Sequence, residues 1–205
     1  MANGVSARRY SAVAILLHWA SALGVLVLIG LGLTMTHATL APLRQFQLYQ
    51  WHKSVGVTVL ALTALRVLWR LTHRPPPHPA GMPARERRAA GVAHALLYLL
   101  LVGLPLTGWA VVSLSPFNIP TVLYGLVPWP HLPLADLVPD QAAAEGVLKR
   151  VHALGAWFLA ALLAVHVAAA LRHHLLLRDD VLRRMLPGRR LSPAPTAAPT
   201  VEPTR

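Results

Sequence analysis

Four long apolar stretches constrain this chain more than any other feature. They occupy residues 12–35, 55–68, 91–114 and 151–171, and none of them contains Asp or Glu. The chain is 55% hydrophobic and only 13% charged, so most of its charge lies between these stretches. About 20 apolar residues are needed to cross the hydrocarbon core of a bilayer. We therefore expect an all-α, four-helix transmembrane bundle with spans over about 12–35, 52–71, 91–114 and 148–171.

The connecting segments favour a single membrane domain over residues 1–186. The loop 72–88 and the longer loop 115–146 are rich in proline, which stops helices and favours extended connectors. The longer loop also carries aromatic and aliphatic side chains, so we expect it to lie on the mouth of the bundle or in the membrane interface. Residues 187–205 are rich in Pro, Thr and Ala, and this composition predicts a disordered tail.

The formal net charge of +12 is distributed as in a membrane protein. Placing both termini in the cytoplasm puts 14 Lys and Arg residues on the inner side and four on the outer side. The four outer residues are Arg44, Lys53, Lys149 and Arg150. By the positive-inside rule this predicts cytoplasmic N- and C-termini. The basic charge then indicates topology and contact with anionic lipid, and it does not indicate nucleic acid.

The chain has no cysteine. This excludes disulfides, thiolate metal sites, iron–sulfur clusters and the covalent attachment of a c-type haem.

Four histidines within these spans are arranged as two pairs. His152 and His166 are 14 residues apart, which separates them by roughly 21 Å on nearly the same face of one helix. In the expected topology His52 lies at the depth of His152, and His18 at the depth of His166. Two pairs at two depths predict two stacked, non-covalent b haems with bis-histidine ligation, so all four histidines are expected to bind iron.

Two further polar residues belong to this interpretation. Arg66 follows His52 by 14 residues and is expected to bind the propionates of the inner haem, unless it snorkels to the inner surface. His94 lies at the inner end of the third span. It is expected to support the inner site or a propionate, and the alternative is that it competes with His18 or His166 as a ligand.

The same segments resemble the bacterial cytochrome b561 family of four-helix di-haem membrane proteins. The matching stretches are LLHWASAL around His18, WHKSVGVTVLALTALRVLWR from Trp51, HALLYLLLVGLPLTGW from His94 and VHALGAWFLAALLAVHVAAALRHH from Val151. The resemblance implies b-type haems, a multi-pass protein of the bacterial inner membrane, and electron exchange with quinone. Some members oxidise superoxide outside and pass the electron to ubiquinone. This chain departs from the family in having Asn118 after Pro116 and Phe117, where Gly is frequent.

The sequence therefore predicts a transmembrane electron carrier between a small periplasmic donor, with superoxide as a candidate, and quinone. Its activity would be that of an oxidoreductase. An alternative is a haem-bearing membrane anchor that relays electrons for a hydrogenase or dehydrogenase partner subunit, because such anchors share the architecture. A metal-ion permease using the same histidines is a third hypothesis, which the lack of carboxylates within the spans disfavours.

Overall fold

The computed structural model describes residues 9–78 and 81–188. Four long helices account for most of them. They are α1 (Ala12–His37), α2 (Pro42–Thr72), α3 (Ala84–Leu114) and α4 (Gln141–Arg172). Each is long and apolar enough to cross a membrane, so the expected four-helix transmembrane bundle is confirmed. The predicted disordered tail lies largely outside the described residues.

The helices extend beyond the expected spans. The turn between α1 and α2 contains only residues 38–41, whereas the sequence suggested a helix starting near residue 52. Pro42 is the first residue of α2, where its missing N–H costs nothing because the first N–H groups of a helix have no partner within the helix. Pro105 lies inside α3, and the helix continues past it to Leu114.

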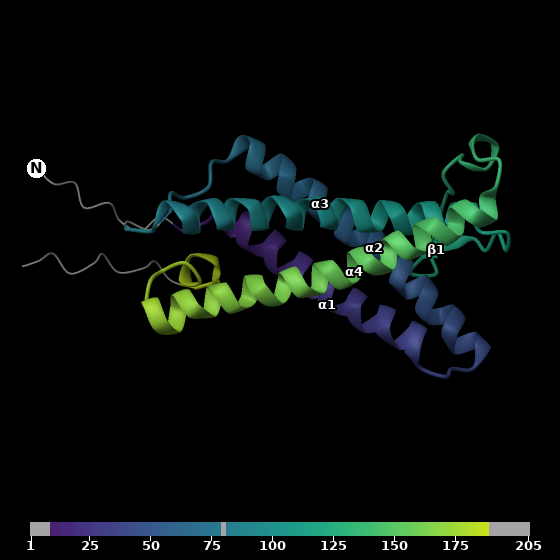
Figure 1. Cartoon of the computed structure of the whole chain (residues 1–205), viewed down its shortest axis with the longest axis horizontal. Helices are drawn as coiled ribbons and strands as arrows, with labels where there is room; N and C mark the ends of the chain where they lie inside the picture. The colour runs from purple at the N-terminus through teal and green to yellow at the C-terminus, as the bar shows by residue number, and fades with distance from the viewer. Residues whose placement is uncertain (1–8, 79–80, 189–205) are drawn as a thin grey trace, which may run out of the picture.

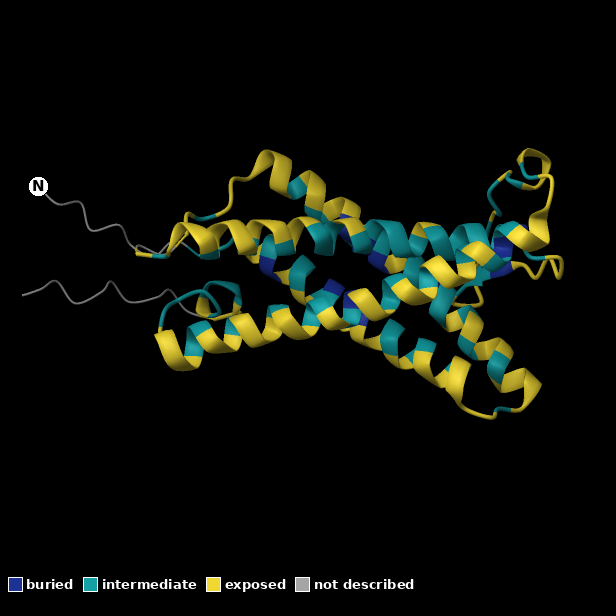
Figure 2. Cartoon of the chain, viewed as in Figure 1, coloured by how far each residue is buried: buried dark blue, intermediate teal, exposed yellow. Residues whose placement is uncertain are grey.

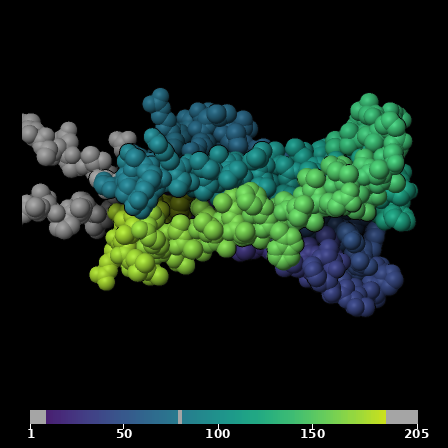
Figure 3. Space-filling model, in the orientation of Figure 1, coloured from purple at the N-terminus to yellow at the C-terminus, as the bar shows by residue number. Residues whose placement is uncertain are grey.

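The helices form two antiparallel pairs, α1 with α2 and α3 with α4. In Figure 1 the two pairs cross near the middle of the bundle and diverge toward its ends. The space-filling view shows the corner between α1 and α2 standing away from the body of the molecule (Figure 3). The centre contains one buried residue from each helix, namely Val25, Val59, Leu101 and Leu159. In Figure 2 the few buried residues, drawn in dark blue, are distributed along the length of the bundle.

Glycines allow close packing within each pair. A Cβ at Gly24 of α1 would lie 2.6 Å from Cγ2 of Val59 on α2, and a Cβ at Gly155 of α4 would lie 2.8 Å from Cδ2 of Leu104 on α3. Such approaches are typical of membrane helices, where small residues permit tight backbone contact. Large side chains on the outside of the helices, by contrast, remain exposed, with Leu16 at 68% and Leu154 at 70%. An apolar surface of this kind suits lipid.

A short hairpin follows α3 and closes one end of the bundle. Strands β1 (Thr121–Leu123) and β2 (Val127–Trp129) pair antiparallel, with Thr121 opposite Trp129. Tyr124, in the turn, donates its N–H to Ser54 (2.9 Å), and its hydroxyl lies 2.6 Å from that of Thr58. After the hairpin, the N–H of Leu132 bonds Ser113 of α3 at 2.9 Å. The long loop therefore lies on the bundle mouth, as expected, and we call this end the hairpin end.

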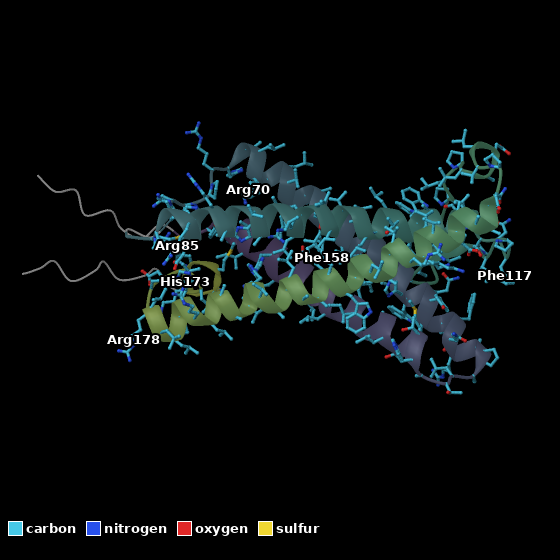
Figure 4. The ribbon with its side chains drawn as sticks, viewed as in Figure 1. Arg70, Arg85, Phe117, Phe158, His173 and Arg178 are labelled. Carbon is cyan, nitrogen blue, oxygen red and sulfur yellow. The ribbon has the colours of Figure 1, made fainter. Side chains whose placement is uncertain are left out.

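The opposite end, which we call the terminal end, holds the start of α1 and the segment after α4. The π-helical turn η2 (His173–Leu177) extends α4, and the 3₁₀ turn η3 (Arg183–Met185) then returns toward α1. The indole of Trp19 donates to the carbonyl of Met185 at 2.7 Å. Figure 4 labels Arg70, Arg85, His173 and Arg178 at this end, with Phe117 at the other.

Candidate functional site: two histidine pairs

The hairpin-end pair consists of His52 of α2 and His152 of α4. Their ring centroids are 6.2 Å apart, with an angle of 69° between the ring planes. Glycines lie against both rings. A Cβ at Gly32 of α1 would lie 3.6 Å from Cε1 of His52, and a Cβ at Gly108 of α3 would lie 3.2 Å from Cε1 of His152. All four helices thus contribute to this site.

The terminal-end pair consists of His18 of α1 and His166 of α4. Here the ring centroids are 6.4 Å apart and the angle between planes is 64°. His166 follows His152 by 14 residues within α4, so the pairs lie roughly 21 Å apart along that helix. The structure therefore brings together the same two pairs that the sequence predicts.

The spacing within each pair suits a metal ion held between the two rings. A bond from a metal to an imidazole nitrogen is about 2 Å long, and the ring centre lies about 1 Å behind that nitrogen, so two axial imidazoles have centres about 6 Å apart. Within the described residues, no group of three or more His, Asp or Glu side chains is arranged to hold a metal ion. Each pair would thus supply two ligands, the number that the iron of a b-type haem takes from the protein.

The surroundings of His152 determine which nitrogen carries its proton. Nδ1 lies 3.1 Å from the Leu104 carbonyl and 3.1 Å from the Thr107 hydroxyl, both on α3. That hydroxyl donates to the same carbonyl at 2.8 Å. Because a carbonyl only accepts, the hydrogen of the imidazole must be on Nδ1, and Nε2 keeps its lone pair. Nδ1 of His52 is buried and has no hydrogen-bond partner among the described residues.

The surroundings of His18 differ, because a cation faces it. Nη2 of Arg66 lies 3.3 Å from Nδ1 of His18. The guanidinium carbon of Arg66 also lies 5.3 Å from the Tyr98 ring centroid, and that of Arg70 lies 6.0 Å from the same ring. Guanidinium groups only donate, so this contact requires the lone pair of His18 to be on Nδ1.

His94 also belongs to the terminal end. Its ring centroid is 5.6 Å from that of His166, at 67° between planes. This separation is shorter than the one between His18 and His166, so both roles considered for His94 stay open. Among the other histidines, His173 begins the turn η2 after α4. Its side chain is only 12% exposed and contacts Asp179 at 2.5 Å.

The two lysines next to the hairpin-end pair in the sequence, Lys53 and Lys149, have different partners. The Lys53 ammonium lies 3.4 Å from the Pro120 carbonyl, next to the hairpin. Lys149 forms an ion pair with Glu145 at 3.0 Å, and the Glu145 side chain is only 11% exposed. The count of outer basic residues includes both lysines, but in the structure a carboxylate offsets the charge of Lys149.

Sequence reasoning did not find Leu104, Thr107 and Gly108, which enclose His152. Thr107 and Gly108 lie one turn after Leu104 on α3, yet the three residues form no recognisable motif. Their contact with His152 depends on how α3 packs on α4. Gly155, three residues after His152, also contributes, because a Cβ there would lie 2.8 Å from Cδ2 of Leu104.

Four apolar helices that hold two histidine pairs at two levels are typical of four-helix membrane cytochromes. Comparison with known proteins agrees with this class. The sequence pattern of the prokaryotic cytochrome b561 family matches residues 9–188. This chain belongs to the prokaryotic cytochrome b561 family, and it is therefore a haem-binding electron carrier of a membrane.

Similar proteins align with this chain over most of their length. Cytochrome b561 homolog 2 of Escherichia coli (strain K12) is 31% identical over 179 residues, which cover 87% of this chain and 91% of the relative. A probable superoxide oxidase, CybB of Yersinia pestis, is 31% identical over 188 residues, covering 89% of this chain and 98% of the relative. Cytochrome b561 homolog 1 of E. coli (strain K12) is 27% identical over 139 residues, covering 68% of this chain and 74% of the relative.

Proposed function

We propose that this protein carries electrons across the bacterial inner membrane with two non-covalent b haems. His52 and His152 hold the haem at the hairpin end, and His18 and His166 hold the haem at the terminal end. The main support is the presence of two histidine pairs with ring centroids 6.2 and 6.4 Å apart at two levels of one bundle. The hairpin end faces the periplasm, which leaves both termini in the cytoplasm in accordance with the positive-inside rule.

The protein contributes binding, orientation and electrostatics, and a bound haem supplies one-electron exchange at its iron. All four histidines are partly buried between the helices. Arg66 provides positive charge for a haem propionate at the terminal end. Its guanidinium already lies between His18 and Tyr98, and a cation within a membrane needs an anionic partner.

The electron donor in this proposal is a small anion in the periplasm, and the acceptor is a quinone in the membrane. The similarity to a probable superoxide oxidase over 89% of the chain favours superoxide as the donor. Lys53, at the rim of the hairpin end, would attract such an anion.

Haem analysis of the purified protein tests the proposal directly. We expect two haems per chain by pyridine haemochrome assay, low-spin spectra typical of bis-histidine iron, and complete extraction of the pigment by acid acetone. A single haem per chain, or pigment that stays with the protein, would refute the arrangement.

A second candidate function is that of a haem-bearing anchor in a hydrogenase or dehydrogenase complex. The hairpin end exposes large apolar side chains, including Phe117 at 78%, Leu126 at 81% and Leu137 at 74%, which would suit a partner subunit. Liposomes that contain the purified chain and a quinone separate the two functions. Quinone reduction by superoxide without another protein supports the independent carrier, and its absence favours the anchor.

A further inference from the structure

Three residues of α3 surround the imidazole of His152 on one side. Thr107 and Gly108 follow Leu104 by three and four residues, so both lie next to it on one side of the helix. The Leu104 carbonyl and the Thr107 hydroxyl each lie 3.1 Å from Nδ1. A Cβ at Gly108 would lie 3.2 Å from Cε1 and 3.5 Å from Nδ1 of the same ring.

We propose that Thr107 and Gly108 are positioning residues that fix the orientation and tautomer of the His152 imidazole. The proposal rests on the proposed ligation of iron by His152. The Thr107 hydroxyl donates to the Leu104 carbonyl at 2.8 Å, which directs its lone pairs toward Nδ1–H of the imidazole. The ring thus donates to two oxygens of α3, and Nε2 points away with its lone pair available.

Gly108 provides the space for this contact. A Cβ at 3.2 Å from a ring atom would require either the ring or the helix to move. Other glycines of α3 have no such neighbour, since a Cβ at Gly103 would meet nothing within 4 Å. Gly155 of α4 complements Gly108, because its lack of a side chain lets Leu104 pack against the helix that carries His152.

Hydrogen bonds from Nδ1–H to oxygen acceptors make an axial imidazole a stronger electron donor, and this stabilises ferric iron. Thr107→Val removes one acceptor and keeps the shape of the side chain. We expect the full-length Thr107→Val protein to retain two haems per chain while the midpoint potential of the hairpin-end haem rises. The low-spin EPR signal of that haem should also shift. Thr107→Ser retains the hydroxyl, so its midpoint potential and EPR signal should match those of the unsubstituted protein.

Gly108→Ala should have a larger effect than Thr107→Val. We expect the hairpin-end haem to become high-spin or to be lost, whereas Gly103→Ala, on the same helix, keeps two low-spin haems. His152→Ala, prepared in parallel, identifies the signals of the hairpin-end haem and tests ligation separately. If His152→Ala retains that haem, the proposed ligation is wrong.

The positioning role is overturned if His152→Ala removes the haem but Thr107→Val leaves its potential and EPR signal unchanged. It is also overturned if Thr107→Val and Thr107→Ser shift them equally, or if Gly108→Ala behaves like Gly103→Ala. The Thr107 variants decide the question alone if Gly108→Ala does not fold.

Discussion

At the hairpin end, His152 faces a carbonyl and a hydroxyl of α3, whereas at the terminal end His18 faces the guanidinium of Arg66. The first arrangement leaves Nε2 of the imidazole free to bind iron without any change. The second uses Nδ1 of His18 as an acceptor, which places its proton on Nε2. For Nε2 of His18 to bind iron, Arg66 must leave Nδ1 and find another anionic or polar partner.

From this comparison we expect two sites of similar geometry in one bundle to differ in redox behaviour. The histidine spacing is nearly equal at the two ends, 6.2 and 6.4 Å, so ligand geometry does not distinguish them. Their electrostatic surroundings do. Neutral oxygens bond the histidine at one end, while two arginines and a third histidine lie close to the other. Positive charge near a haem stabilises its reduced state, so we expect the terminal-end haem to have the higher potential.

The largest expected effect is the loss of one haem when a ligand is removed. His52→Ala or His152→Ala should abolish the hairpin-end haem, and His18→Ala or His166→Ala the terminal-end haem, because one imidazole rarely holds a haem that needs two. The pyridine haemochrome assay should fall from two haems per chain to one. His37→Ala, at the end of α1, is the matched control and should keep both. Loss of both haems from each single variant would show that the sites are not independent.

The number of helices and the two levels of histidines could be predicted from the sequence for physical reasons. The apolar stretches fix the number of helices, and the spacing of His152 and His166 fixes two levels along α4. The helix ends beyond the membrane could not be predicted, because Pro42–Gln50 and Gln141–Leu148 are too polar to score as a span. The short hairpin was missed because its strands contain only three residues each. Its stability depends on bonds to Ser54 and Thr58 that no local pattern reveals.

The electrostatic surroundings of the two sites were predicted only in part. Arg66 was expected near the inner site because it shares a helix face with His52, and it lies there, against His18. The residues around His152 depend on the packing of α3 on α4, which sequence periodicity does not fix. The ion pair of Lys149 with Glu145 has the spacing of four residues that favours such pairs in a helix. The spacing of Glu145 and Lys149 in the sequence is therefore sufficient to predict this ion pair.

The second-largest expected effect is on the rate at which the electron donor reduces the hairpin-end haem. Lys53→Glu should slow the reduction of the hairpin-end haem by superoxide by roughly tenfold at low salt, because it reverses the charge beside the site. Lys149→Glu should have a smaller effect, since Glu145 already offsets the charge of Lys149. Stopped-flow reduction in detergent, at unchanged haem content, measures both. The rate of the unmodified protein should also fall with ionic strength. A rate that is indifferent to salt and to both substitutions would exclude electrostatic steering and leave the haem arrangement intact.

A third effect tests the charge at the terminal end. Arg66→Gln removes a cation next to His18, so the terminal-end haem should become easier to oxidise. At an effective dielectric constant of about 20, a charge about 10 Å away contributes roughly 1–2 kcal/mol, which is about 40–90 mV for one electron. Potentiometric titration should therefore show one midpoint potential falling by about this amount and the other unchanged. Arg66→Lys keeps the charge and should retain most of the potential. A shift confined to the hairpin-end haem would contradict the placement of Arg66.

The smallest expected effect is that of His94→Ala, and it decides the ligand assignment at the terminal end. His94 lies 5.6 Å from His166, closer than His18 at 6.4 Å, so distance alone would favour His94 as the partner. His18 is nevertheless the ligand in our proposal, because its 6.4 Å separation from His166 matches the 6.2 Å between His52 and His152. His94→Ala should thus retain two haems per chain and low-spin spectra at both sites.

The double variant His18→Ala/His94→Ala should bind as much haem as His18→Ala alone. If His94→Ala loses a haem while His18→Ala keeps two, then His94 and His166 are the ligands. The terminal-end site would then have to be compared with the hairpin-end site through the surroundings of His94 instead of those of His18.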